Sequence, residues 1–294
     1  MDFWDLLASW GFRKELVDLE PKAADGPAVV VKEPLPEIFT LGAWCGYSTL
    51  KNPKRDVDFA KSIGLSRLDI IVNDHSADRL PRRFDMRDAQ EIVTLAKLCE
   101  EAGIEVHLMS WCMPHADYLK GAADQLLELR EKMRFESIQW DAEEPWTLAK
   151  KGMGYQKAAD LIAERFAGRD FEMGVNGIRY APTRKLKPLT AICDYWTPQC
   201  YATNTSKADP STVSDKGVAT WTKKFGKAPR WVIGVAGYRQ DGINGHKTPR
   251  SAVMAALEGA AEHCDEAVIW SLASLRRSNS TAAGVRDFTA RHEK

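Results

Sequence analysis

Short apolar runs alternate with longer amphipathic segments along most of the chain. Each apolar run is bounded by turn-forming or charged residues, which is typical of short strands. Eight such runs are found, at 38–46, 67–74, 105–113, 137–143, 171–177, 194–202, 230–238 and 266–274. The segments between them repeat apolar positions at helical spacing, and several end at a glycine, as helices often do: Gly64, Gly103 and Gly168.

Eight strand–helix units within 294 residues predict a closed (β/α)8 TIM barrel, an α/β fold, in one domain spanning 37–294. A short helix and a linker rich in proline, alanine and charge precede it, and we interpret residues 1–36 as an N-terminal extension. A nucleotide-binding sheet is the alternative, but no G-x-G-x-x-G follows the first strand and no G-x-x-x-x-G-K-[ST] occurs. We therefore expect a barrel without a cofactor.

Charge and composition narrow the partners. The 41 basic and 41 acidic residues balance, so we expect neither nucleic acid nor an anionic membrane as a partner. No apolar run reaches the roughly 18 residues of a membrane span. The six cysteines lack the paired spacing of a metal site, so we expect no metal and a reducing compartment. The first residues carry acids where a signal peptide has a basic leader, so we expect cytoplasmic synthesis, with action on a cell wall after release.

The fourth predicted strand ends in three carboxylates within SIQWDAEEPW, at 137–146. Barrel enzymes keep their active site at the carboxyl ends of the strands, and side chains alternate along each strand. Asp141 and Glu143 therefore share one side, while Glu144 projects to the other. Two carboxylates so close cannot both ionise cheaply, so one pKa rises. We expect the outer residue, Glu143, to hold a proton and act as general acid, with Asp141 below it as an orienting group. The alternative is a solvated loop start paired with nearby lysines.

Other predicted strand ends supply polar and aromatic groups. Gln199 and Tyr201 share one side of the sixth strand, and the tyrosine hydroxyl can hydrogen-bond a substrate carbonyl or an oxyanion. Trp270 on the eighth strand is a candidate floor for a sugar ring, or else a core residue. The remaining candidate substrate contacts are Trp44, Asp74, Trp111, Asn176 and Glu144.

These residues resemble the barrel of family 18 glycoside hydrolases, the chitinases and related peptidoglycan-cleaving enzymes. The signature D-x-x-D-x-D-x-E of that family is matched at its last two acids, whereas Glu136 and Gln139 stand at the first two. The resemblance implies that Glu143 donates the proton, that Asp141 positions the N-acetyl group of the substrate as internal nucleophile, and that Tyr201 and Trp270 contact this sugar. The family 25 lysozyme barrel is also similar in its D-x-E, but it expects an aspartate on strand one, where this chain reads LGAWCG.

The sequence thus favours a glycosidase that cleaves a polysaccharide containing N-acetylhexosamine, most of all bacterial peptidoglycan, as an endolysin does. One alternative is a metal-dependent sugar isomerase or epimerase, in which Asp141 and Glu143 hold a divalent cation together with His107 or His75. The other alternative is a carbohydrate-binding barrel without catalysis.

Overall fold

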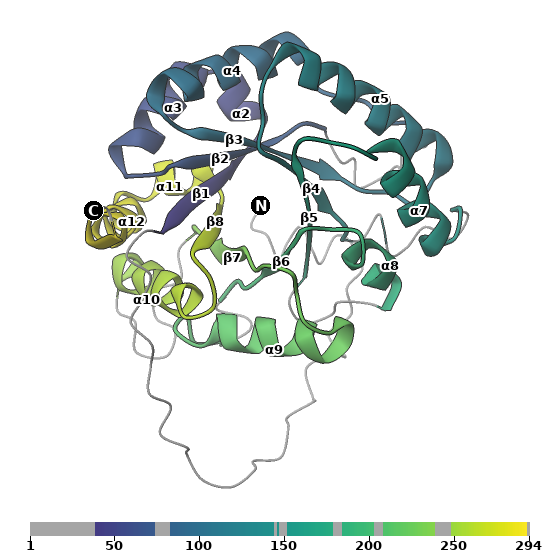
Figure 1. Ribbon diagram of the computed structural model, residues 1–294. Coiled ribbons are helices and arrows are strands. Elements are labelled where there is room, and N and C mark those ends of the chain that lie inside the picture. Colours follow the sequence, from purple (N-terminus) through teal and green to yellow (C-terminus); the bar gives the residue numbers. More distant parts are fainter. Residues whose placement is uncertain are drawn as a thin grey trace, which may run out of the picture.

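Eight parallel strands close into a barrel in the order in which they occur along the chain (Figure 1). The structure is a computed structural model, and it describes residues 39–73, 83–143, 146, 152–178, 184–202, 208–238 and 248–292. The strands are β1 (Thr40–Cys45), β2 (Arg67–Ile71), β3 (Glu105–Trp111), β4 (Ser137–Asp141), β5 (Glu172–Ile178), β6 (Tyr195–Gln199), β7 (Ile233–Ala236) and β8 (Glu266–Trp270). The predicted (β/α)8 barrel is confirmed, and the strands pair through β1 and β8 to complete the circle. The predicted extension at 1–36 lies outside the described residues.

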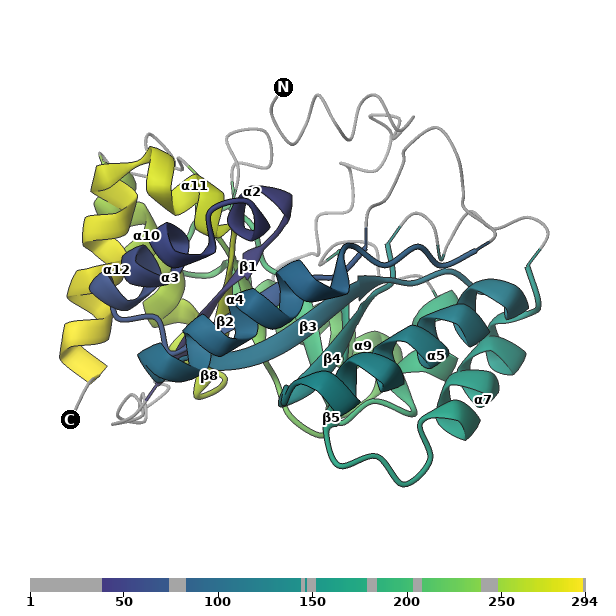
Figure 2. The same cartoon turned by 90° about the horizontal axis from the view of Figure 1, so that it is seen from above.

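Helices surround the barrel and cover its outer face (Figures 1 and 2). The longer helices are α3 (Pro53–Ser62), α4 (Ala89–Ala102), α5 (Ala116–Lys132), α7 (Tyr155–Arg165), α9 (Val213–Phe225), α10 (Pro249–Ala261) and α12 (Asn279–His292). The shorter ones are α2 (Tyr47–Leu50), the 3-10 turn η2 (Arg184–Leu186), α8 (Lys187–Thr190) and α11 (Leu272–Arg277). Within the described part of the chain, no helix is both long enough and apolar enough to cross a membrane.

Helix α4 shows how the sequence sets the helix ends. The Asp88 side chain accepts hydrogen bonds from the backbone N–H groups of Gln90 and Glu91, at 2.8 and 3.1 Å, and so caps the first turn. Gly103 ends the helix at φ 73°, a left-handed conformation that glycine adopts without a steric penalty.

The end of the eighth strand differs from the prediction. The apolar run at 266–274 reads as one strand, but β8 ends at Trp270 and α11 begins at Leu272. Leu272 and Leu275 are both buried, three residues apart on one helix face. Helical spacing therefore begins inside a run that looks uniformly apolar in sequence.

Alternation along each strand sorts the side chains into two cores. Outward residues such as Ile138 and Trp140 of β4 are buried against the helices. Inward residues form a separate cluster inside the barrel, which includes Trp44, Met109 and Tyr195. The residues at the carboxyl end of the barrel are built on this second set.

Charged side chains fill the amino-terminal end of the barrel. Arg67, 1% exposed, donates to both carboxylate oxygens of Asp69, at 2.8 and 2.6 Å, and to Glu266 at 3.0 Å. Glycines make room for this layer. A Cβ at Gly174 would lie 2.2 Å from the ring of Tyr195, and one at Gly42 would lie 2.8 Å from Cγ of Arg67. The network closes this end of the barrel, which leaves the opposite end for a site.

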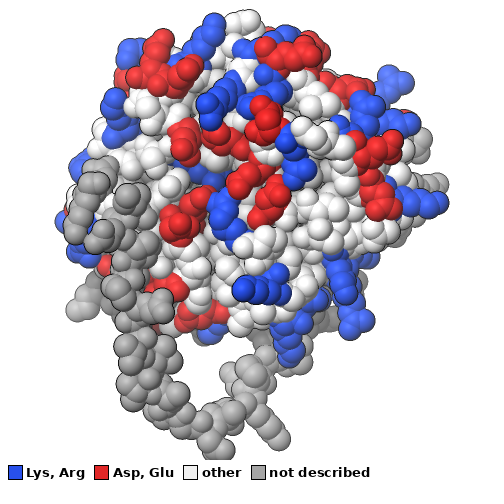
Figure 3. Space-filling model, in the orientation of Figure 1, with Lys and Arg blue, Asp and Glu red and all other residues white. Residues whose placement is uncertain are grey.

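The molecular surface is mixed in charge. Acidic and basic side chains alternate over the described residues of the face in Figure 3, and neither sign gathers into a continuous patch there. Several charged side chains of the described residues lie in ion pairs, such as Arg134 with Glu136 at 2.8 Å. This mixed pattern agrees with a net charge of zero.

Candidate active site

Two carboxyl groups stand one above the other on the inward face of β4 and the residues that follow it. Asp141 is 1% exposed and Glu143 is 6% exposed. Asp141 lies in register between Trp111 of β3 and Asn176 of β5. Strand parity predicts this pair, and the structure places both residues at the carboxyl end of the barrel, where barrel enzymes carry out their chemistry.

Asp141 is the carboxyl whose proton affinity the structure raises. Burial, and then the negative charge of Glu143, hold the pKa of Asp141 well above its usual range. Its Oδ1 is buried and has no hydrogen-bond partner among the described residues, so no donor there stabilises a negative charge on that oxygen. The sequence predicts a raised pKa at the outer carboxyl, Glu143, and this stays a prediction. For the inner carboxyl, Asp141, burial and the charge of Glu143 raise the pKa.

Amide side chains link Glu143 to neighbouring strands. Nε2 of Gln199 donates to Oε1 of Glu143, and it also donates to Oδ1 of Asn176 at 2.7 Å. Nδ2 of Asn176 lies 3.3 Å from Oε1 of Gln139. Asn176 has no exposed surface, and Gln199 is almost fully buried. Both predicted candidates therefore lie beside the carboxyl pair, where they hold its geometry.

Two tyrosines follow β6 and β7 at the carboxyl end of the barrel. Tyr201 follows β6, and its ring meets that of Tyr238 edge-on, at 6.2 Å between centroids. Burial, and then the charge of Glu143, hold the pKa of the Tyr201 phenol well above its usual range. Tyr201 therefore stays protonated and can donate a hydrogen bond to a ligand.

Three tryptophans predicted as sugar contacts occupy different depths. Trp270 is partly exposed and packs against Trp44 at 5.7 Å, and its peptide bond to Ser271 is cis. Trp111 is also partly exposed. Trp44 has no exposed surface and donates from its indole N–H to Gln139 at 2.9 Å. Trp270 and Trp111 are thus available to a ligand, whereas Trp44 lies beneath Trp270.

Some site residues are not found by sequence reasoning, and two predicted ones lie outside the described residues. Tyr238 follows β7 on its inward side, and the same parity rule that selects Tyr201 could have found it. Asn73 follows β2, and its side chain binds the hydroxyl of Tyr118 at 2.6 Å and the backbone N–H of Trp111 at 3.0 Å. It thereby positions Trp111. Nothing is described at the predicted candidates Asp74 and Glu144.

His107 lies too deep to share a metal ion with the carboxyl pair. It pairs in register with Ser137, four residues before Asp141, which corresponds to about 13 Å along a strand. Its Nδ1 hydrogen-bonds Ser137 at 2.7 Å, and burial, followed by the charge of Arg67, lowers its pKa to about 3. His107 is therefore a neutral core residue. No cluster of three metal-binding side chains occurs among the residues that the structure describes. The other candidate ligand, His75, lies outside the described residues.

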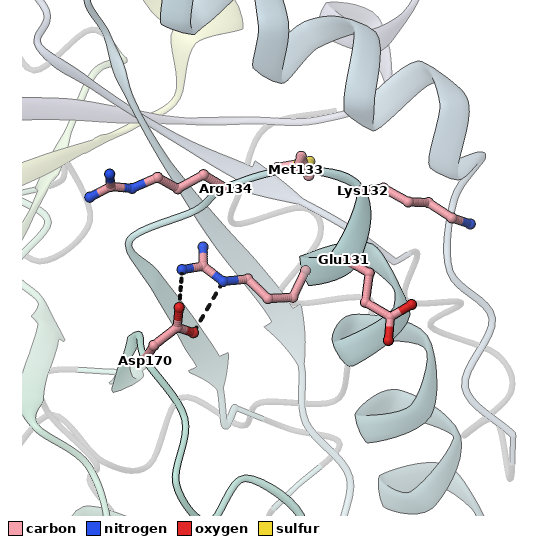
Figure 4. Close-up of a pocket in the computed structure, with 6 residues that line it drawn as sticks. Glu131, Lys132, Met133, Arg134 and Asp170 are labelled. Atoms are coloured by element: carbon pink, nitrogen blue, oxygen red, sulfur yellow. Dashed lines mark hydrogen bonds and ion pairs between the residues drawn. The ribbon is translucent and has the colours of Figure 1, made fainter.

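A shallow depression lies at the other end of the barrel, before the starts of β4 and β5 (Figure 4). It is lined by residues 130–134 and Asp170. Arg130 faces Asp170 and forms a two-pronged ion pair with it, at 3.2 and 2.8 Å. The carboxylate of Asp170 is thereby paired with a cation, and no aromatic ring lines the depression, so we do not consider it a catalytic site.

Comparisons with known proteins find the same barrel in carbohydrate-related structures. No protein-family model and no curated protein matches the sequence. Among solved structures, a GH113 β-1,4-mannanase is 12% identical with a TM-score of 0.61, over 89% of this chain and 100% of that one. A GH18 chitinase from Pseudoalteromonas aurantia is 10% identical with a TM-score of 0.59, over 86% and 99%. A xylanase and α-amylase inhibitor protein from Scadoxus multiflorus is 12% identical with a TM-score of 0.52, over 86% and 97%. The chain is therefore similar in fold to the (β/α)8 barrels of glycoside hydrolases, including a family 18 chitinase.

Proposed function

We propose that the protein is a glycoside hydrolase that cleaves a polysaccharide containing N-acetylhexosamine, with Glu143 as the general acid. The observation that carries this proposal is the Asp141–Glu143 pair at the carboxyl end of the barrel, with an ionisable proton and aromatic rings around it. A pair of carboxyl groups is what glycoside hydrolysis requires most often. The fold, shared with a chitinase and a mannanase, supports the same class.

The proposed reaction begins with the proton of the pair. Because both groups ionise only at a high cost in free energy, the pair retains one proton in a pH range where an isolated carboxyl has lost it. Glu143 lies nearer the mouth and passes this proton to the glycosidic oxygen as the C1–O bond breaks. Tyr201 and the carboxyl groups then face the sugar that carries the developing positive charge.

Asp141 is proposed to guide the N-acetyl group of the same sugar. The carbonyl oxygen of that group attacks C1 as the leaving group departs, and positive charge spreads onto the acetamide. A carboxylate with a raised pKa is a stronger base, so Asp141 can accept the acetamide N–H as this charge develops. Water then attacks C1, opens the ring that has formed, and returns a proton to Glu143.

Among N-acetylated polysaccharides, we propose bacterial peptidoglycan as the first substrate to test. No disulfide joins any of the six cysteines, all of which lie in the described residues and five of which are buried. This is typical of proteins made in a reducing compartment and fits an enzyme released from the cytoplasm onto a wall. The test is to incubate the protein with purified peptidoglycan and, separately, with chitin, and to identify the soluble fragments by mass spectrometry. New reducing ends from either polymer support the glycosidase. Fragments from chitin alone would reject peptidoglycan as the substrate. If no N-acetylated polymer releases fragments, the proposal itself is rejected.

A carbohydrate-binding or inhibitory barrel is the second candidate function. The similar fold of a xylanase and α-amylase inhibitor protein favours it, because such an inhibitor protein has been solved in complex with the sugar trehalose. Saccharide binding by calorimetry without any release of reducing ends would select this candidate over the hydrolase.

A further inference from the structure

A row of hydrogen-bonded side chains runs inside the barrel from Trp44 to Glu143. The indole Nε1 of Trp44 donates to Oε1 of Gln139 at 2.9 Å. Nδ2 of Asn176 approaches the same oxygen at 3.3 Å, and Oδ1 of Asn176 accepts from Nε2 of Gln199 at 2.7 Å. The row ends where Nε2 of Gln199 donates to Oε1 of Glu143. It connects four strands and the catalytic candidate.

The three amides of the row can form two complete sets of hydrogen bonds. In the observed set, the oxygen of Gln139 faces both the indole N–H of Trp44 and the nitrogen of Asn176. The oxygen of Asn176 faces the nitrogen of Gln199, and the same nitrogen faces Glu143. If all three amides turned over, every link between them would still join a nitrogen to an oxygen, and the carbonyl oxygen of Gln199 would face Glu143. The other amide end of Gln139 meets the hydroxyl of Thr197 at 2.9 Å, and a hydroxyl can donate or accept, so Thr197 permits both sets.

Trp44 distinguishes the two sets, because an indole N–H can only donate. The turned-over set would place the NH2 group of Gln139 against this N–H, and both groups would lose a partner inside the buried core. Trp44, Gln139, Asn176 and Thr197 have no exposed surface, so solvent cannot replace the lost bond.

We infer that Trp44 and Gln139 are positioning residues, which lock Asn176 and Gln199 in the one orientation that presents an N–H donor to Oε1 of Glu143. Oε1 is then always an acceptor, and a proton carried by Glu143 resides on Oε2. The inference rests on the proposed role of Glu143 as general acid, and it adds that the direction of its proton is set by a tryptophan that does not touch the substrate.

The experiment follows the Glu143 carboxyl directly, by carbon-13 NMR titration of the protein without substrate. Comparison with Glu143→Gln assigns its signal. In Trp44→Phe the amides are free to turn over, which favours a protonated Glu143, so its titration moves up by about one pH unit. Gln199→Met removes the donor itself and produces a shift at least as large. Because Gln199→Met cuts the row at its end, adding Trp44→Phe to it produces no further shift.

Trp140→Phe is the matched control. Trp140 is as buried as Trp44, lies on the outward face of β4, and its Nε1 has no hydrogen-bond partner among the described residues. This variant loses stability in the same way and leaves the titration unchanged. Gln139→Met cuts the row one residue later and replaces Trp44→Phe if that variant does not fold.

An unmoved Glu143 titration in Trp44→Phe or Gln139→Met overturns the inference, as does an equal shift in Trp140→Phe. The titration needs no substrate, so its outcome is separate from that of the proposed function. If the titration of Glu143 shifts but the protein hydrolyses no polysaccharide, the proposed hydrolase is rejected and the positioning role of Trp44 and Gln139 stands. If the protein hydrolyses polysaccharide but the titration does not move, the positioning role is rejected and the hydrolase stands.

Discussion

Gln199 donates a hydrogen bond from its side-chain amide to a carboxyl oxygen of Glu143, although the two residues come from strands that are not neighbours. Between them lies β5, whose Asn176 accepts from the same amide nitrogen at 2.7 Å. Glu143, which follows β4, is therefore held by groups on β5 and β6. Because closure of the barrel fixes these strands relative to one another, the carboxyl is positioned by the fold as a whole.

Replacing Asp141 with asparagine should stabilise the protein at neutral pH. The raised pKa of Asp141 means that the folded state binds its proton more tightly than the unfolded state, in which the pKa is about 3.9. Stability from this group is present below that value and is lost as pH rises toward the folded pKa, by about 1.4 kcal/mol for each pH unit that separates the two pKa values. Urea unfolding of the unchanged protein and of Asp141→Asn from pH 4 to 8 measures this loss of stability. The gap in free energy of unfolding should widen with pH in favour of Asp141→Asn, and a pH-independent gap would contradict the assignment.

Two glycine-to-alanine changes should have opposite effects on stability. At Gly174 the new Cβ would lie 2.2 Å from the ring of Tyr195, inside a packed barrel, so Gly174→Ala should cost about 3 kcal/mol or prevent folding. At Gly121, within α5, the nearest atom would be Cβ of Phe84 at 3.5 Å, an ordinary contact. Gly121→Ala should therefore stabilise the helix by about 0.5–1 kcal/mol. Thermal and urea unfolding compare the two, and equal effects would show that the interior layer is not close-packed as described.

Trp270 should contribute to substrate binding more than to the chemical step. Its partly exposed ring at the barrel mouth offers an apolar surface, and Trp270→Leu removes much of it, so we expect KM to rise about tenfold with a smaller change in kcat. Trp231→Leu is the control, because Trp231 lies on the outer side of the barrel and packs against Trp196 at 5.6 Å. If both variants keep the KM of the unchanged protein, Trp270 is a core residue and not a sugar contact.

The barrel and much of the site follow from strand periodicity alone. The alternation of side chains along each strand selects four inward residues at strand ends: Asp141, Glu143, Gln199 and Tyr201. A parallel barrel brings the carboxyl ends of all its strands to one face, so these residues meet there. The same rule applies to Tyr238, which sequence reasoning passed over among several apolar residues.

Depth within the barrel could not be predicted in this way. Parity places Trp44 on the inward side, but only packing shows that Trp270 covers it and that its N–H meets Gln139. The pKa of Asp141 is raised because the residue is buried beside the charge of Glu143, and this burial depends on contacts between strands. Residues whose side chains hydrogen-bond between strands can be identified only when the register of the strands is known.

The most direct measurement is the release of reducing ends from peptidoglycan and chitin by Glu143→Gln, beside Glu136→Gln. Both substitutions replace a carboxyl with an amide of the same shape. Glu136 precedes β4 at the other end of the barrel and pairs with Arg134 on the surface. Loss of a general acid lowers kcat by about 10²–10⁴-fold, so Glu143→Gln should be nearly inactive while it still binds saccharide, and Glu136→Gln should hydrolyse normally. Near-normal hydrolysis by Glu143→Gln, with its fold confirmed by circular dichroism, would contradict the assignment of Glu143 as the proton donor.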